Sequence, residues 1–175
     1  MTSDLERRIA RLGLALPAAP APRGAYESVV IHDDLAYVSG QVCRIADGVI
    51  AGPVSDTTTP ETIRHAAHTC VLRALAALKA SLPAALEIDR TLFLRGFVHA
   101  AAGFAHYGRV LDEASTLLHE ILGARGRHAR SAVGVAGLPD GALLEIELVV
   151  ALTRVPNDGR IGPTSRDSRD GLEFS

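Results

Sequence analysis

Residues 127–148, RHARSAVGVAGLPDGALLEIEL, decide the fold class of this chain. The small and β-branched residues after Arg130 predict a strand, GLPDG has the composition of a turn, and the apolar run beyond it predicts a second strand. That second strand carries two carboxylates, Glu145 and Glu147. Carboxylates in a strand this apolar suggest that one face of the sheet has a role other than packing.

Side chains alternate along the last predicted strand, so its two faces can be separated by residue number. One face should lie under helices, and its members are Leu144, Ile146, Leu148, Val150 and Leu152. The other face carries Glu145, Glu147, Val149 and Ala151. Because this second face is half apolar, we expect it to meet another subunit rather than water.

The segments before this region predict two helices and three further strands. A helix is indicated from Thr59-Pro60-Glu61 to Pro83 by its N-cap, its proline and its apolar stripe. A second amphipathic helix is expected over residues 107–123. Strand-forming runs at 26–32, 35–42 and 90–100 provide a hairpin and a third strand, and 43–55 reads as a loop or short hairpin.

The predicted order is therefore a short helix followed by ββαβαββ, which is an α+β fold. Two amphipathic helices bury their stripes on one face of a mixed sheet. We divide the chain into an N-terminal helix and linker (1–22), one compact domain (23–153) and a flexible polar tail (154–175). Ser3 and Glu6 have the spacing of a capping box for the N-terminal helix.

Composition restricts the class of protein. The chain has 175 residues, which fits one domain, and its formal net charge is −2 with 4% aromatic residues. These values make nucleic-acid binding an unfavoured hypothesis. Two distant cysteines predict neither a disulfide framework nor a zinc site. Without a secretory signal or a transmembrane run, a soluble cytoplasmic protein is expected.

Arg130 and Glu145 are the candidate functional pair. Val133 is assigned to the core, so strand alternation should place Arg130 on the same side of the sheet as Glu145. A guanidinium beside small residues can hold a carboxylate through two hydrogen bonds, and a nearby glutamate can orient or deprotonate water. The simpler alternative is that Arg130 only forms an interface ion pair with Glu145 or Glu147.

Several motifs in order resemble the RidA family, also called YjgF/YER057c/UK114. The C-terminal signature is GRHARSAVGVAGLP followed by EIE, while Tyr26 and the VSGQ of residues 38–41 match motifs of the N-terminal half. The resemblance covers most of the chain and indicates a longer branch of the family, with an added N-terminal helix and C-terminal tail.

The resemblance implies a chorismate-mutase-like homotrimer with ligand clefts between subunits. It implies an enamine/imine deaminase that converts acids such as 2-aminoacrylate into a 2-keto acid and ammonia without a metal or cofactor. Arg130 matches the carboxylate-binding arginine and Glu145 the glutamate associated with the hydrolytic water. Tyr26, Ser39 and Gly40 match residues that line the cleft, and Ala132 stands where the family often has a cysteine.

Departures from the family pattern leave the substrate open. Ala25 replaces the proline of a Gly-Pro-Tyr motif, and Ala132 replaces the cysteine. The alternatives are a binding trimer that holds a small carboxylic acid without turnover, a dedicated enzyme of one biosynthetic pathway, and, less favoured, an endoribonuclease.

Other reactive side chains have simpler explanations. His65 and His68 have metal-ligand spacing but lack a third ligand, so solvated histidines are expected and no metal site is predicted. Cys70 falls on an apolar stripe and should be inert core. His128 shares the face of Arg130 and could line the cleft or pack at an interface, while Cys43 could lie near the cleft.

Overall fold

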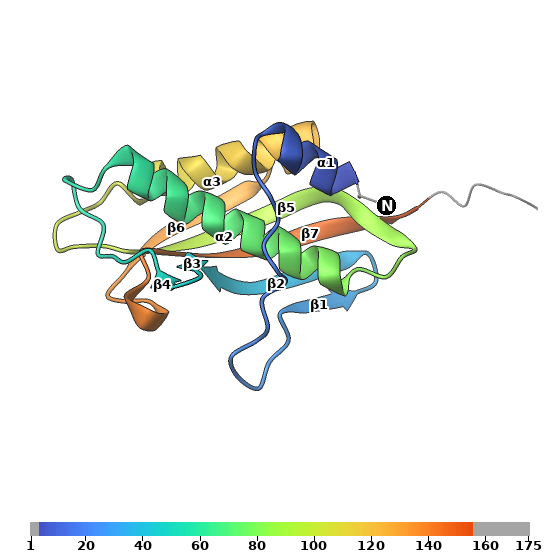
Figure 1. The fold of residues 1–175 in the computed structure, drawn as a ribbon, viewed down its shortest axis with the longest axis horizontal. Coiled ribbons are helices and arrows are strands. Elements are labelled where there is room, and N and C mark those ends of the chain that lie inside the picture. Colours follow the sequence, from blue (N-terminus) through green and yellow to red (C-terminus); the bar gives the residue numbers. More distant parts are fainter. Residues whose placement is uncertain (1–3, 156–175) are drawn as a thin grey trace, which may run out of the picture.

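The computed structural model describes residues 4–155 and contains one five-stranded sheet (Figure 1). The strand order is β1-β2-β7-β5-β6. All neighbours are antiparallel except β5 and β6, which run parallel. The strands are β1 (Val29–His32), β2 (Leu35–Val42), β5 (Leu86–His99), β6 (Ala129–Val135) and β7 (Leu144–Arg154). The mixed sheet and the predicted order of elements are confirmed.

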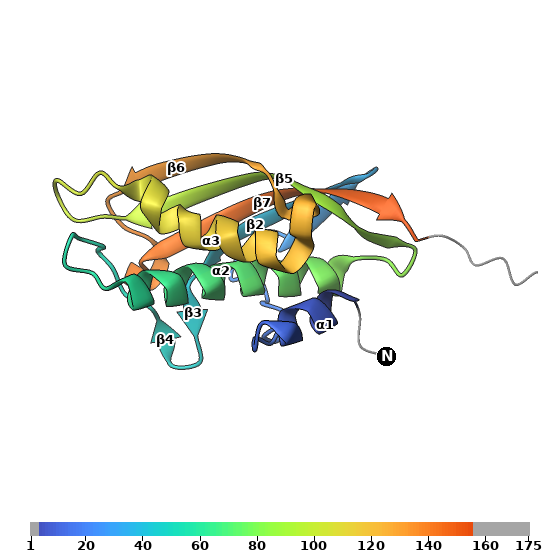
Figure 2. The ribbon, with the colours of Figure 1, turned by 90° about the horizontal axis from the view of Figure 1, so that it is seen from above.

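Two helices, α2 (Pro60–Ser81) and α3 (Tyr107–Leu122), cover one face of the sheet (Figure 2). The predicted N-cap is confirmed, because the Thr62 N–H donates to Thr59 Oγ1 at 3.2 Å. Between the helices and the sheet lies the core, and the alternation predicted for the last strand holds. Its five apolar positions under the helices are buried: Leu144, Ile146, Leu148, Val150 and Leu152.

The N-terminal extension packs on the outside of the helix layer. Helix α1 (Asp4–Arg11) buries Ile9 to 1% exposure, and Lys79 Nζ of α2 donates to Glu6 Oε1 at 2.5 Å. Ser3, the predicted cap of this helix, lies outside the described residues. The chain from residue 12 to β1 forms no helix or strand, as its prolines predicted.

Two smaller features complete the chain order. The short hairpin expected within 43–55 is present as β3 (Arg44–Ile45) and β4 (Gly48–Val49). Strand β5 begins at Leu86, four residues earlier than the sequence indicated. The polar tail is predicted to begin at residue 154, and its part after residue 155 lies outside the described residues. Within residues 4–155, no helix is long and apolar enough to cross a membrane.

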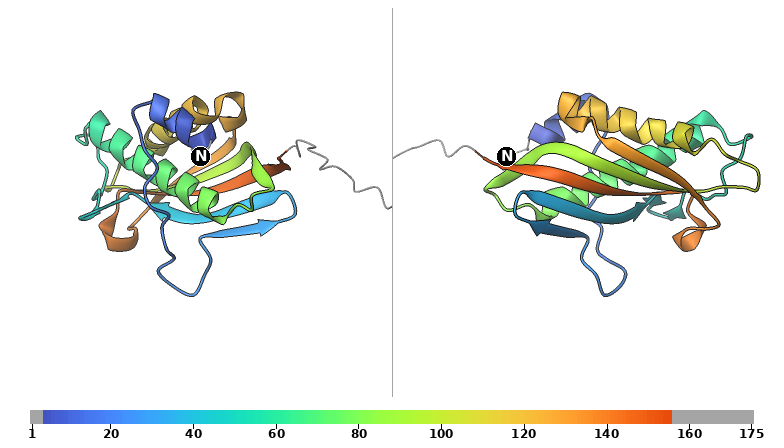
Figure 3. Two further views of the ribbon diagram at one scale, coloured as in Figure 1. Left: turned by 45° about the vertical axis from the view of Figure 1, so that its right-hand side comes forward. Right: turned by 180° about the vertical axis from the view of Figure 1, so that it is seen from behind.

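The face of the sheet opposite α2 and α3 is open. Figure 3 (right) shows it from behind, with no described element across it. Val30, Tyr37 and Val133 point away from the helices and are 51%, 47% and 44% exposed. On the same face Arg95 pairs with Glu147 at 2.9 Å. The open face is therefore a mixed apolar and charged surface, as the alternation of β7 predicted.

Candidate active site

The centre of the candidate site is a break in the register between β2 and β7. Pairing is regular up to Val38 and resumes at Gln41, and Gly40 lies in the interruption. A Cβ atom at Gly40 would lie only 1.7 Å from Glu145 Oε1. Because glycine has no side chain, position 40 leaves the space that the Glu145 carboxylate occupies. Glycine is common at bulges and close approaches of this kind within strands.

Glu145 is a half-buried carboxylate on the open face of β7. Burial, and to a lesser degree the charge of Glu147, raises the pKa of Glu145 above its ordinary value. Glu147 is paired with Arg95, whereas no ion pair or side-chain hydrogen bond within residues 4–155 involves Glu145. An unpaired carboxylate whose pKa is moved toward neutrality is suited to accept a proton from water.

A pocket of about 310 Å³ opens beside this carboxylate, at the edge of the sheet where β1 has not yet begun. Three of the predicted site residues line it: Tyr26, Gly40 and Glu145. Its remaining walls come from the linker before β1, from β2, from β3, from α2 and from the turn before β7. They are Pro20, Ala21, Arg23, Ser28, Gln41, Val42, Arg44, Arg73 and Pro139.

Tyr26 belongs to the wall that the linker forms, and Ser39 of β2 holds that wall in place without lining the pocket. The Ser39 hydroxyl donates to the Glu27 carbonyl oxygen at 2.6 Å, and the Ser39 N–H donates to the Ser28 carbonyl at 3.0 Å. These bonds fasten the segment that carries Tyr26 to β2. The Tyr26 side chain is 51% exposed, and its hydroxyl accepts a weak bond of 3.4 Å from the Arg23 N–H. Ser39 therefore positions the wall, while Tyr26 presents its ring to the opening.

Arg130 lies elsewhere, on the helix-covered face of the edge strand β6. Its Nη1 donates to Ser115 Oγ at 3.0 Å and lies 3.0 Å from Asp112 Oδ1, both on α3. The prediction that Arg130 shares a face with Glu145 is wrong. In the register of the sheet, Arg130 is opposite Leu94, which is fully buried under the helices.

The packing of α3 explains this error. Gly134 is on the same face as Arg130, and a Cβ there would lie 2.3 Å from Cζ of Tyr107 on α3. Ala132 also packs against the core. The small residues Ala132 and Gly134 on β6 thus let α3 approach the strand. From the sequence alone, they are instead interpreted as residues that leave an open pocket beside Arg130. Val133, assigned to the core from its hydrophobicity, points to the open face.

A chain of hydrogen bonds orients the Arg130 region. Ser115 accepts from Arg130 and lies 3.1 Å from His128 Nε2, while His128 Nδ1 lies 2.6 Å from the Gly126 carbonyl. A carbonyl can only accept, so His128 carries its proton on Nδ1 and Ser115 donates to Nε2. Burial, assisted by the Arg130 charge, lowers the pKa of His128, so the ring is neutral at pH 7. His128 supports Arg130 through Ser115.

This region forms an open hollow on the outer edge of α3 and β6, separate from the pocket at Glu145. It is lined by Ser115, Thr116, His119, Gly126, Arg127, His128 and Arg130. Strand β5 lies between β6 and β7, with Glu145 opposite Phe97 and Phe97 opposite Val133. A single subunit therefore does not bring Arg130 or Ala132 together with Glu145, and the simple pairing of Arg130 with Glu145 or Glu147 does not occur within the chain.

The two cysteines are both fully buried. The Cys43 thiol donates to the Ile50 carbonyl at 3.2 Å and the Cys70 thiol to that of Leu144 at 3.4 Å. Burial raises the pKa of Cys70 well above its ordinary value, which keeps it protonated, as expected of core. Neither thiol lines the pocket at Glu145.

Within residues 4–155, His65 and His68 belong to no group of three or more His, Cys, Asp or Glu side chains that could hold a metal ion. Burial lowers the pKa of His68.

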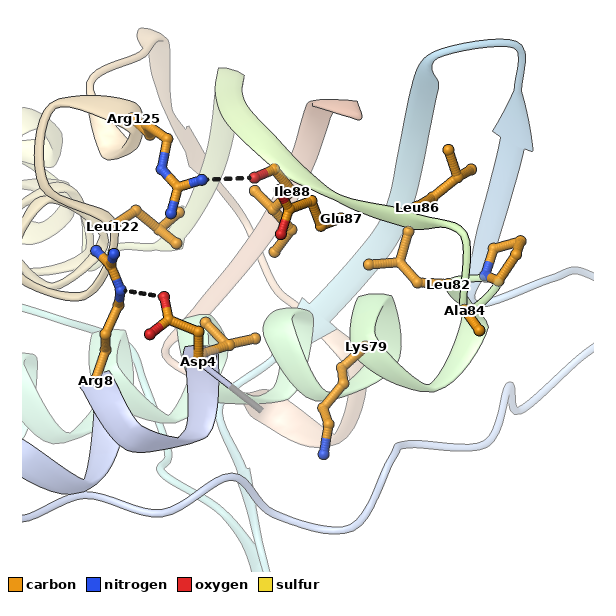
Figure 4. Close-up of a pocket in the computed structure, with 12 residues that line it drawn as sticks. Asp4, Arg8, Lys79, Leu82, Ala84, Leu86, Glu87, Ile88, Leu122 and Arg125 are labelled. Carbon is orange, nitrogen blue, oxygen red and sulfur yellow. Dashed lines mark hydrogen bonds and ion pairs between the residues drawn. The ribbon is translucent and has the colours of Figure 1, made fainter. Parts of the chain in front are cut away.

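A further pocket, of about 250 Å³, lies under α1 at the far end of the helix layer (Figure 4). Leucine and isoleucine side chains line much of it, and its charged rim is largely engaged. Arg8 Nε donates to Asp4 at 2.7 Å, and Arg125 Nη1 donates to the Ile88 carbonyl at 3.1 Å. With these bonds already made, the pocket under α1 offers less to a charged ligand than the pocket at Glu145.

Sequence reasoning missed the arginines of the Glu145 pocket, above all Arg73. A signal was present: Arg73 follows Cys70 by three residues, so it borders the buried stripe of α2, where a charge is unusual. Arg44 comes from the short β3–β4 hairpin, and its position depends on how that hairpin folds back to Asp140. No local pattern indicated that contact.

Comparison with known proteins agrees with this architecture. Residues 16–152 match the sequence model of the family described as endoribonuclease L-PSP. Protein TCP17 of Trypanosoma cruzi is 36% identical over 144 residues, which cover 81% of this chain and 90% of that protein. A crystal structure of a protein of unknown function from Agrobacterium tumefaciens superposes with a TM-score of 0.77 at 36% identity, covering 86% of this chain and 93% of the other.

A protein from Shewanella oneidensis, named as a candidate endoribonuclease, has a TM-score of 0.76 at 28% identity and covers 84% of this chain and 98% of its own. The family match spans β1 to β7 and both sheet-covering helices, and it leaves out α1. This chain therefore belongs to the endoribonuclease L-PSP family, which is the RidA (YjgF/YER057c/UK114) family.

Proposed function

We propose that the protein is a hydrolytic deaminase of small enamine and imine acids, releasing a 2-keto acid and ammonia. The observation that carries the proposal is the Glu145 carboxylate: half-buried, unpaired within residues 4–155, raised in pKa, and set in a pocket of about 310 Å³. Such a group can activate one water molecule beside a small substrate. Membership of the RidA family supports the same chemistry.

The active unit is a cyclic homotrimer in this proposal. Arg130 and Glu145 lie on different strands and on opposite faces of the sheet of one subunit, so a head-to-tail ring could bring the Arg130 of one subunit to the Glu145 of the next. Exposed apolar side chains on the open face, namely Val30, Tyr37 and Val133, support an assembly that buries this surface.

The reaction needs few groups because an imine carbon is already electrophilic. Arg130 holds the substrate carboxylate, with Ser115 and Asp112 fixing its guanidinium. Glu145 accepts a proton from water as the oxygen bonds to the carbon of the protonated imine. The nitrogen of the resulting carbinolamine then takes up that proton, and the C–N bond breaks as the hydroxyl group gives its own proton to Glu145, which leaves the keto acid and releases ammonia. An enamine first takes a proton at carbon to become the imine.

The test is release of keto acid and ammonia from an imine that an amino-acid oxidase generates in the assay. We expect Arg130→Ala and Glu145→Gln each to lower kcat/KM by on the order of 100-fold, in the range typical of lost general-base and orienting groups. Arg11→Ala, at an exposed arginine of α1 away from the open face, is the matched control and should behave like the wild type. Equal rates for the wild type and Arg130→Ala would remove Arg130 from the mechanism.

Binding without turnover is the second candidate, favoured by the departures at Ala25 and Ala132. It predicts that a 2-keto acid binds in titration calorimetry with an affinity that depends on Arg130, while no imine is hydrolysed above the background rate.

The family description also names endoribonuclease activity. This third candidate predicts RNA cleavage that stays constant through repeated purification. Because the chain has a formal net charge of −2, we expect any such activity to be lost. We further expect the protein to be cytoplasmic.

A further inference from the structure

Arg73 of α2 lies in the wall of the Glu145 pocket and has no partner among the described residues. Its Nε is completely buried and makes no hydrogen bond, and no ion pair within residues 4–155 involves it. A buried guanidinium N–H that bonds to nothing costs free energy, so such groups ordinarily find an acceptor. Nε itself is closed off, but Arg73 lines the pocket, so a ligand there can bind the other N–H groups of this guanidinium.

The other two arginines of the pocket share one carboxylate partner, Asp140. Arg44 Nη2 lies 2.5 Å from Asp140 Oδ2, and Arg23 Nη1 lies 3.6 Å from the same oxygen. One carboxylate thus serves two guanidinium groups. Arg73 has no carboxylate partner among residues 4–155, and burial together with the Arg44 charge lowers the pKa of Arg73. An anion bound in the pocket would stabilise the charged form of Arg73 against both burial and the repulsion from Arg44.

Glu145 does not neutralise Arg73, although both line the pocket. A guanidinium in contact with Glu145 would lower the pKa of that carboxyl, whereas burial and Glu147 raise it. No ion pair joins the two side chains. The pocket therefore contains two separate functional groups: the Glu145 carboxylate, which can accept a proton, and the Arg73 guanidinium, which can bind an anion.

We propose that Arg73 binds a second anionic group of the substrate, so that the preferred substrates are imines of dicarboxylic amino acids. This inference rests on the proposed function for the chemistry at Glu145 and adds the substrate class. The guanidinium can take a side-chain carboxylate through two hydrogen bonds. A space of about 310 Å³ equals about ten water volumes, which is enough for an acid of four or five carbons.

Binding of two 2-keto acids of equal length tests this without requiring turnover. Titration calorimetry compares 2-oxoglutarate, which has the second carboxylate, with 2-oxopentanoate, which lacks it. The wild type should bind 2-oxoglutarate about tenfold more tightly or better, as expected for one charge-assisted hydrogen-bonded contact. Arg73→Gln should bring the ratio of the two dissociation constants close to one. It should leave the affinity for 2-oxopentanoate within about twofold of the wild-type value.

Arg64→Gln is the matched control, because Arg64 lies on the same helix outside this pocket and pairs with Glu113 at 3.1 Å. It should keep the wild-type ratio. Should Arg73→Gln fail to fold, Arg73→Met carries the same test with the side-chain stem retained. A wild type without preference for 2-oxoglutarate, or an unchanged ratio in the Arg73 variant, would overturn the inference.

The outcome can be separated from that of the proposed function. Loss of the preference in Arg73→Gln supports the role of Arg73 even if no imine is hydrolysed. Conversely, hydrolysis of imines by the wild type together with equal binding of both keto acids keeps the deaminase and rejects Arg73 as its specificity residue.

Discussion

Substitution of Gly40 by alanine should separate activity from stability. The new methyl carbon would lie 1.7 Å from Glu145 Oε1, whereas real Cβ contacts are not shorter than 3.0 Å, so the oxygen must move by about 1.3 Å. The clash involves the free end of a flexible side chain, which can turn toward the open pocket. We therefore expect a loss of stability below about 1 kcal/mol, small for a substitution near a sheet.

Catalysis should respond much more strongly than stability. A displacement of about 1 Å at a reacting group can cost on the order of 100-fold, so kcat/KM for imine hydrolysis should fall by about that factor. The Tm, measured by differential scanning fluorimetry, should change by no more than about 2–4 °C. The assay follows keto acid formation with an amino-acid oxidase supplying the imine.

Gly137→Ala is the control for the exchange of glycine by alanine, because a Cβ at Gly137 meets no atom within 4 Å. It should retain both turnover and Tm. Full turnover in Gly40→Ala would mean that the position of the Glu145 carboxylate is immaterial, and the role given to Glu145 would have to be abandoned.

Three further predictions concern the pH response, the assembly and the helix cap. Since the pKa of Glu145 is raised by folding, its ionised form costs stability at neutral pH; Glu145→Gln should raise Tm at pH 7.5, and the gain should vanish at pH 4, below the ordinary value of 4.5. Val133→Asp, at a site 44% exposed in one subunit, should yield monomers in size-exclusion chromatography with light scattering, and an unchanged trimer would contradict the proposed interface. Thr59→Ala removes the bond to the Thr62 N–H and should lower stability by about 1 kcal/mol, read in urea unfolding; no change would mean that water replaces the cap.

Local patterns were sufficient for the elements of the fold. Period-two alternation assigned the buried face of β7, and the Thr59-Pro60 start located α2, because both signals arise within a few residues. The family motifs likewise pointed to Tyr26, Gly40 and Glu145, which the structure places in or beside one pocket. These residues come from neighbouring strands and the adjoining linker.

The position of Arg130 required the tertiary structure. Alternation states which residues share a face of β6 but not which face is covered, and hydrophobicity favoured the wrong one because Val133 is apolar yet exposed. Whether α3 packs over Arg130 depends on the close fit of Tyr107 against Gly134, residues 27 positions apart in the chain.

Order along the chain and burial within each strand follow from short-range periodicity, so they can be read from the residues alone. The meeting of Arg73 with the Glu145 pocket, and the separation of Arg130 from it, depend on strand order and helix packing. Those contacts join segments distant in sequence, and no pattern within one segment encodes the partner that another segment will supply.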